Sequence, residues 1–121
     1  MFWVWRHGYK FLRVEAHRPD APALSVHLGS TGCSGEAPTD RPARCTRPNR
    51  ARVRLDGFDP RRDGVDFDLG ALFADLTLPA DRADAGCESA PDDPDCQGIF
   101  DALGLSGARA QRAFRVRKGP R

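Results

Sequence analysis

The first fifteen residues, MFWVWRHGYKFLRVE, alternate with a period of two, which predicts a β-strand. Successive side chains of a strand point to opposite faces, so one face would carry Trp3, Trp5, His7, Tyr9 and Phe11. Residues two apart on one face are roughly 6–7 Å apart, which lets the side chains of Trp5 and His7 converge on one small ion. The alternative is that this aromatic face packs into a core, because aromatic residues are enriched in strands.

A return strand is expected over residues 23–28, after a turn over residues 17–22. Apolar residues at every second position define one face of this strand, and His27 belongs to the other. In a hairpin, residues 25–29 lie beside the first strand, so His27 and His7 could approach each other. Two neutral imidazoles near aromatic side chains suit copper or zinc, whereas oxygen-rich loops suit calcium or magnesium.

The four cysteines fall into two local pairs, and each pair brackets a polar loop: Cys33 with Cys45, and Cys87 with Cys96. No C-x-x-C or zinc-finger spacing is present, and local pairing is the simplest of the three possible connectivities. Each disulfide would close a loop of about a dozen residues, worth on the order of 3 kcal/mol, and would indicate an oxidising compartment. The alternative, a four-thiolate metal site, requires two distant loops to meet.

The rest of the chain predicts a mainly β fold: an antiparallel, β-sandwich-like half-domain with two short helices and two disulfide-closed loops. The helices are expected over residues 71–76, capped by Asp68, and over residues 94–103, ended by Gly104. The expected strands cover residues 52–58, 65–69 and 113–117, with a hairpin turn over residues 61–64. The stretches 29–49 and 80–94 read as long irregular loops.

The composition of the chain narrows the possible functions further. The chain has 121 residues and a net charge of +2, with 19 basic and 17 acidic residues, which fits one small domain. No apolar run approaches the roughly 20 residues needed to cross a bilayer, and no signal peptide is recognisable. No aromatic-and-basic platform for nucleic acids is visible, and the Arg-rich C-terminal stretch is interpreted as a solvated edge strand.

No catalytic motif is recognisable. The serines occupy no nucleophile elbow, and no Gly-rich loop joins a strand to a helix, so the chain is not expected to be an enzyme. A run of aspartates invites a calcium hypothesis, but EF-hand spacing is not met, and turns and a helix cap explain most of these residues. The run consists of Asp56, Asp59, Asp63, Asp66 and Asp68.

Several long blocks of the sequence resemble the MbnP-like proteins, also called metallo-mystery pair system four-Cys motif proteins. The blocks cover nearly the whole chain in order and contain all four cysteines. They are MFWVWRHGYKFLRVE (1–15), HLGSTGC (27–33), PNR (48–50), LDGFDP (55–60), DLGALFADLTL (68–78), GCESAPDDPDCQGIFDALGL (86–105) and FRV (114–116).

The resemblance implies an exported copper-binding protein of the periplasm, of which residues 1–121 would be the C-terminal portion of a single domain. It also implies a partner, a diheme enzyme resembling MauG and the bacterial cytochrome c peroxidases, that oxidises a tryptophan to kynurenine. By position, Trp5 and His7 match the family's Trp-x-His spacing, and His27 matches the histidine of HLGSTGC. The implied Cu(I) ligands are His7, His27 and Trp5 as kynurenine, with Trp3 competing as the modified residue.

The modification is chemically reasonable because an indole nitrogen is only a donor, whereas kynurenine exposes an aryl amine that can coordinate a metal. Two other functions are compatible with the sequence. One is a secreted, disulfide-stapled interaction module whose aromatic face binds another protein surface. The other is a structural domain stabilised by calcium at the Asp-rich loops.

Overall fold

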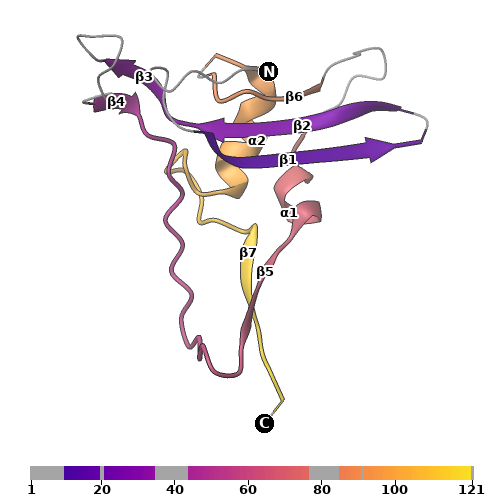
Figure 1. Ribbon diagram of the computed structural model, residues 1–121, viewed down its shortest axis with the longest axis vertical. Coiled ribbons are helices and arrows are strands. Elements are labelled where there is room, and N and C mark those ends of the chain that lie inside the picture. Colours follow the sequence, from indigo (N-terminus) through magenta and orange to yellow (C-terminus); the bar gives the residue numbers. More distant parts are fainter. Residues whose placement is uncertain (1–9, 20, 35–43, 77–84, 91, 121) are drawn as a thin grey trace. The chain divides into compact units, whose positions relative to one another are not determined.

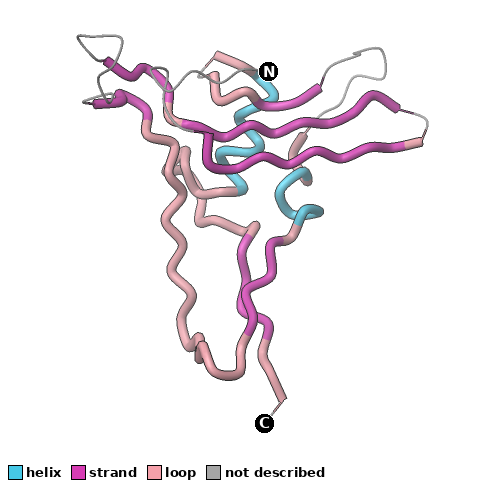
Figure 2. The backbone as a smooth tube through the Cα atoms, in the orientation of Figure 1, coloured by secondary structure: helices cyan, strands magenta, loops and turns pink. Residues whose placement is uncertain are grey.

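The computed structural model describes residues 10–19, 21–34, 44–76, 85–90 and 92–120. These residues form a mainly β structure with three small sheets and two short helices (Figures 1 and 2). Together with two disulfides, this structure confirms the predicted fold class. They divide into two units. The first contains the described residues up to Arg50 and from Ala85 to Cys96, and the second contains Ala51–Leu76 and residues 97–120.

A three-stranded sheet organises the first unit. Strand β2 (Ala21–Gly29) lies between β1 (Lys10–Arg18), its antiparallel hairpin partner, and β6 (Ala85–Cys87), which is parallel to it (Figure 1). The apolar face of β2 is buried, as expected for a central strand. The hairpin is as predicted, but its turn is shorter than residues 17–22, because strand pairing continues to the pair Arg18 and Ala21.

Strand β6 lies within the stretch predicted as an irregular loop, so that prediction is wrong for residues 85–87. Three residues are too few to show a periodic pattern, and only their pairing with β2 makes them a strand. Gly86 permits this pairing. A Cβ atom built on Gly86 would lie 1.9 Å from the backbone oxygen of Ser25, and its φ of +154° is one that side-chain-bearing residues rarely adopt.

The first cysteine pair joins two short strands directly opposite each other. Strand β3 (Thr31–Ser34) pairs antiparallel with β4 (Arg44–Arg47), and Cys33 faces Cys45 across the pair. The ends of the stretch 29–49 are therefore strands, contrary to the predicted loop. The two disulfides connect Cys33 with Cys45 and Cys87 with Cys96, the predicted pairs, so the alternative four-thiolate metal site is wrong.

A two-stranded ribbon and two helices form the second unit. Strand β5 (Gly64–Phe67) pairs antiparallel with β7 (Phe114–Arg117), and helix α1 (Leu69–Phe73) follows β5. Asp68 caps α1 as predicted, since its Oδ1 accepts a hydrogen bond from the amide of Ala71 at 3.0 Å. Helix α2 (Pro94–Ala102) also confirms its prediction; it begins in the first unit and continues in the second. The buried apolar residues described in the second unit are Leu72, Ile99, Ala102, Leu103 and Ala113.

The predicted strand over residues 52–58 is wrong. Its residues alternate in exposure as far as Leu55, as those of a strand would, but they pair with no strand in the described part of the chain. Strand β5 pairs instead with β7, about fifty residues later, so the predicted hairpin through residues 61–64 does not form. The intervening turn does form, because the carbonyl of Asp59 accepts hydrogen bonds from the amides of Arg62 and Asp63.

The aspartates of the calcium hypothesis each contact an arginine or lysine. The basic residues near the C-terminus supply three of these ion pairs, at 2.8–3.0 Å, while their side chains stay 60–69% exposed, in line with the predicted solvated edge strand. Within the described residues, no group of three or more His, Cys, Asp or Glu side chains is arranged to hold a metal ion. Asp63, Asp66 and Asp68 therefore pair with basic residues in or next to β7, whereas the other two aspartates pair with arginines close to them in sequence. The pairs are Asp56–Arg54, Asp59–Arg62, Asp63–Lys118, Asp66–Arg117 and Asp68–Arg115.

Of the helices in these described ranges, none is long and apolar enough to cross a membrane.

Replacing Gly86 by alanine should destabilise the protein by about 2–4 kcal/mol, because the new Cβ atom would push β6 away from β2. The matched control is Gly107→Ala, which has a positive φ of +72° but no atom within 4 Å of the built Cβ. This control should lose only about 1–2 kcal/mol, the cost of the left-handed backbone. Urea unfolding measures both values, and equal losses would contradict the close-contact explanation.

Asp63 is the most strongly perturbed carboxyl described. Its side chain is only 1% exposed and lies 2.8 Å from Nζ of Lys118. The hydrogen bond from Lys118, followed by one from the amide of Asp59, lowers the pKa of Asp63 from 3.8 to about 2. Because this pKa is lower in the folded state, the ionised carboxylate stabilises the fold above about pH 3.8. That stabilisation is lost as the pH falls through about 2.

Replacing Lys118 by methionine should therefore flatten the acid limb of the stability curve. The pKa of Asp63 would rise toward 3.8, so the free energy of unfolding should fall less between pH 4 and pH 2 than in the wild type. Urea unfolding across this range, with an NMR titration of the Asp63 carboxyl, tests the expectation. Parallel stability curves for the two proteins would contradict it.

Candidate functional site around His27

His27 lies in the central strand of the three-stranded sheet, on the face opposite to the buried leucines. It pairs with Arg13 of β1, and Glu15 pairs with Ser25, so these four residues share one face of the hairpin. His27 is only 7% exposed. The prediction that His27 occupies the non-leucine face is confirmed, and the imidazole on that face is buried.

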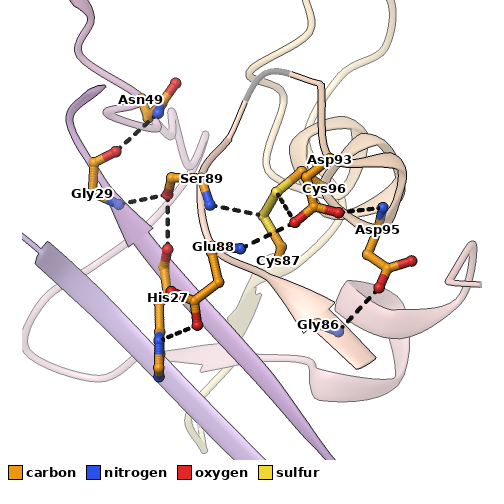
Figure 3. Close-up of a disulfide and its surroundings, with 10 residues drawn as sticks. All are labelled: His27, Gly29, Asn49, Gly86, Cys87, Glu88, Ser89, Asp93, Asp95 and Cys96. Atoms are coloured by element: carbon orange, nitrogen blue, oxygen red, sulfur yellow. Dashed lines mark hydrogen bonds and ion pairs between the residues drawn. A yellow bond between two sulfur atoms is a disulfide. The ribbon is translucent and has the colours of Figure 1, made fainter. Parts of the chain in front are cut away.

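Two carboxylates flank the imidazole from the neighbouring strands. Oε1 of Glu88, which directly follows β6, lies 2.8 Å from Nδ1 of His27 (Figure 3). Oε1 of Glu15 in β1 lies 3.7 Å from Nε2, beyond hydrogen-bonding distance. The Glu88 oxygen is close but off the line of the ring N–H bond, so neither ring nitrogen has an aligned hydrogen-bond partner among the described residues.

Glu15 is engaged by a neighbour on its own strand. Nε of Arg13 donates to Oε1 of Glu15 at 2.8 Å, and Nη2 of Arg13 contacts the same oxygen. The hydrogen bond from Arg13 is the main cause that lowers the pKa of Glu15, with a smaller contribution from His27. Glu15 is therefore an ionised carboxylate whose charge is largely balanced by Arg13.

The backbone that carries His27 is held by two polar side chains from other segments. The hydroxyl of Ser89 donates to the carbonyl of His27 at 2.7 Å and accepts from the amide of Gly29 at 2.8 Å (Figure 3). Nδ2 of Asn49 donates to the carbonyl of Gly29 at 2.9 Å. Ser89 and Asn49 both adopt positive φ, which costs non-glycine residues energy and is maintained by these contacts.

The segment carrying Glu88 and Ser89 is itself tied to the start of α2. The disulfide joins Cys87 to Cys96, and Oδ2 of Asp93 accepts from the amide of Glu88 at 3.4 Å. Oδ2 of Asp95 accepts from the amide of Gly86 at 3.2 Å. The disulfide and the helix start thus determine where the Glu88 carboxylate meets the imidazole (Figure 3).

The structure brings together only part of the predicted site. Trp3, Trp5 and His7 lie outside the described residues, whereas His27 is described and buried. His17, the third histidine, is exposed on β1. The four cysteines are structural disulfides in this structure.

Sequence reasoning missed Glu15, Glu88, Ser89 and Asn49. The hairpin register would have placed Glu15 on the face of His27, but the irregular turn left that register open. Glu88 and Ser89 carried a weaker signal, because they follow Cys87 within a block shared with the family. Their approach to His27 depends on β6, a strand that no sequence pattern predicts.

Comparison with known proteins places the chain in a family. The family model described as MbnP matches residues 1–89. Among solved structures, MbnP from Methylosinus trichosporium is similar, with 32% sequence identity and a TM-score of 0.80. The match covers 98% of this chain and 50% of that protein, so the chain spans about half the length of this relative. A search of curated proteins finds no match.

Three segments meet around His27, and each belongs to a sequence block that resembles the MbnP-like proteins. HLGSTGC supplies His27 and Gly29, PNR supplies Asn49, and GCESAP supplies Glu88 and Ser89. The sequence resemblance is thus confirmed by an independent family match and by a structural match over nearly the whole chain. The chain belongs to the MbnP family.

Proposed function

We propose that this protein binds copper as Cu(I), with His27 as one ligand, and that it does not itself catalyse a reaction. The observation that carries the proposal is the buried imidazole of His27, whose Nε2 has no hydrogen-bond partner among the described residues. Buried polar atoms are normally satisfied, so a site with such an atom favours a bound ligand. Imidazole is a good ligand for copper.

The other proposed ligands are His7 and Trp5, the latter after oxidation to kynurenine. The proposed partner is a diheme enzyme of the MauG and cytochrome c peroxidase class, using peroxide as the oxidant. Two equivalents of peroxide each deliver one oxygen atom and leave as water, which cleaves the C2–C3 bond of the indole to give N-formylkynurenine. Hydrolysis by one water then releases C2 as formate and leaves a ketone and a free aryl amine. Trp3 is the alternative target, because both tryptophans precede His7 by an even number of residues.

We place the protein in the periplasm or outside the cell. The two disulfides support this location, because disulfides persist in oxidising compartments. They also favour a nitrogen-based copper site, since all four cysteines are oxidised and none offers a thiolate. The calcium alternative is weaker, because every aspartate it invoked is paired with a cation.

Replacing His27 by alanine should weaken Cu(I) binding by more than about 100-fold, since loss of an outer-shell partner alone typically costs 10–100-fold. The matched control is His17→Ala, which removes an exposed imidazole from the same hairpin. Competition with a colorimetric Cu(I) chelator measures both affinities. Unchanged affinity in the His27 variant would rule out this ligand.

Co-expression with the diheme enzyme should convert Trp5 to kynurenine. Tryptic mass mapping of residues 1–13 would then show the gain of one oxygen and the loss of one carbon, and fragmentation would assign it to Trp5 or Trp3. The matched variant Trp5→Phe should lose the modification and the copper affinity that depends on it. If the copper-loaded protein contains only intact tryptophans, the histidine ligands remain supported and the kynurenine ligand is contradicted.

A further inference from the structure

We propose that Glu88 is a positioning residue for the metal site: it holds the proton of neutral His27 on Nδ1 and thereby leaves the Nε2 lone pair for the metal ion. The inference rests on the proposed function, because it assigns the nitrogen through which His27 would bind copper. It concerns a residue that neither the sequence pattern nor the family motif of histidine and tryptophan identifies.

The two distances decide which nitrogen carries the proton. An ionised carboxylate can only accept hydrogen bonds, so a ring nitrogen beside it is favoured in its protonated form. Oε1 of Glu88 lies 2.8 Å from Nδ1, whereas Oε1 of Glu15 lies 3.7 Å from Nε2. An unprotonated Nδ1 would direct its lone pair at a carboxylate oxygen in contact with it, which is repulsive. The same repulsion at Nε2 is weaker, because the distance is longer and Arg13 balances the charge of Glu15.

The backbone of Glu88 is firmly held, while its side chain keeps some freedom. Cys87 is tied to α2 by the disulfide, Ser89 is fully buried, and the amide of Glu88 is bonded to Asp93. The Glu88 side chain is 38% exposed, so its carboxylate can turn onto the line of the Nδ1–H bond without disturbing the core. Carboxylates that accept the second N–H of a ligating histidine set its tautomer and ring orientation in many metal sites.

Glu15 provides a matched comparison within the same site. It is the same residue type, its side chain is 39% exposed, and it contacts the other ring nitrogen of the same histidine. Replacing Glu15 removes a neighbouring carboxylate of equal charge without removing the contact to Nδ1. A general electrostatic role would make the two glutamates equivalent, whereas the proposed role makes only Glu88 important.

The first experiment uses the full chain, oxidised, 15N-labelled and free of metal. Long-range 1H–15N correlation spectra at about pH 8 report which ring nitrogen of a neutral imidazole carries the proton. A His27→Ala spectrum assigns the His27 signals. The wild type and Glu15→Ala should show protonated Nδ1, and Glu88→Ala should shift the proton to Nε2. A wild type protonated on Nε2, or an unchanged Glu88→Ala spectrum, would overturn the proposal.

The second experiment measures Cu(I) affinity in the same variants. Glu88→Ala should weaken binding by about 10–100-fold, and Glu15→Ala by no more than a few-fold. Glu88→Gln retains an oxygen acceptor, so it should retain the Nδ1–H tautomer and most of the affinity. Equal losses in Glu88→Ala and Glu88→Gln, without a change of tautomer, would indicate a structural role and contradict the proposal.

The two measurements separate this proposal from the proposed function. If the tautomer depends on Glu88 but the wild type binds no copper, the copper function fails and the tautomer assignment stands. If copper binding requires His27 but neither the tautomer nor the affinity depends on Glu88, the positioning role fails and the copper function stands.

Discussion

The hydroxyl of Ser89 bridges two backbone groups of β2, and the arrangement around His27 depends on it. It accepts from the amide of Gly29 and donates to the carbonyl of His27, and all three groups belong to buried residues. An unsatisfied buried polar group costs about 1–3 kcal/mol, so one hydroxyl prevents two such losses. It also joins β2 to the residue after Glu88, which brings the carboxylate beside the imidazole.

The charged residues of the two units have different roles. In the second unit, the aspartates and the basic C-terminal residues pair across the β5–β7 ribbon, and exposed pairs of this kind contribute little individually. In the first unit, Glu88 approaches a buried imidazole instead of an arginine or lysine. The carboxylate of Glu88 can therefore take part in the chemistry of the His27 ring. The paired aspartates of the ribbon, in contrast, contribute to the fold.

Local patterns in the sequence determined much of the fold. The β1–β2 hairpin followed from alternation, α1 from the cap of Asp68, α2 from its proline start and apolar stripe, and β7 from the alternation that includes Phe114 and Val116. The disulfide pairs followed from spacing, because short loops close most easily. His27 was identified as a site residue for the same kind of reason, since strand alternation separated it from the leucines.

Tertiary structure alone decided the remaining features, because they depend on contacts between residues far apart in sequence. The side chains of residues 51–55 alternate in exposure as those of a strand do. A strand also needs a hydrogen-bonded partner, and β5 pairs with β7 rather than with these residues. Strand β6 exists only because Gly86 lets its backbone approach Ser25. His27 and Glu88 are 61 positions apart in the sequence, and the parallel pairing of β2 with β6 brings them into contact. The sequence by itself determined that His27 belongs to the non-leucine face of a strand, and only the fold decided which carboxylate contacts each of its nitrogens.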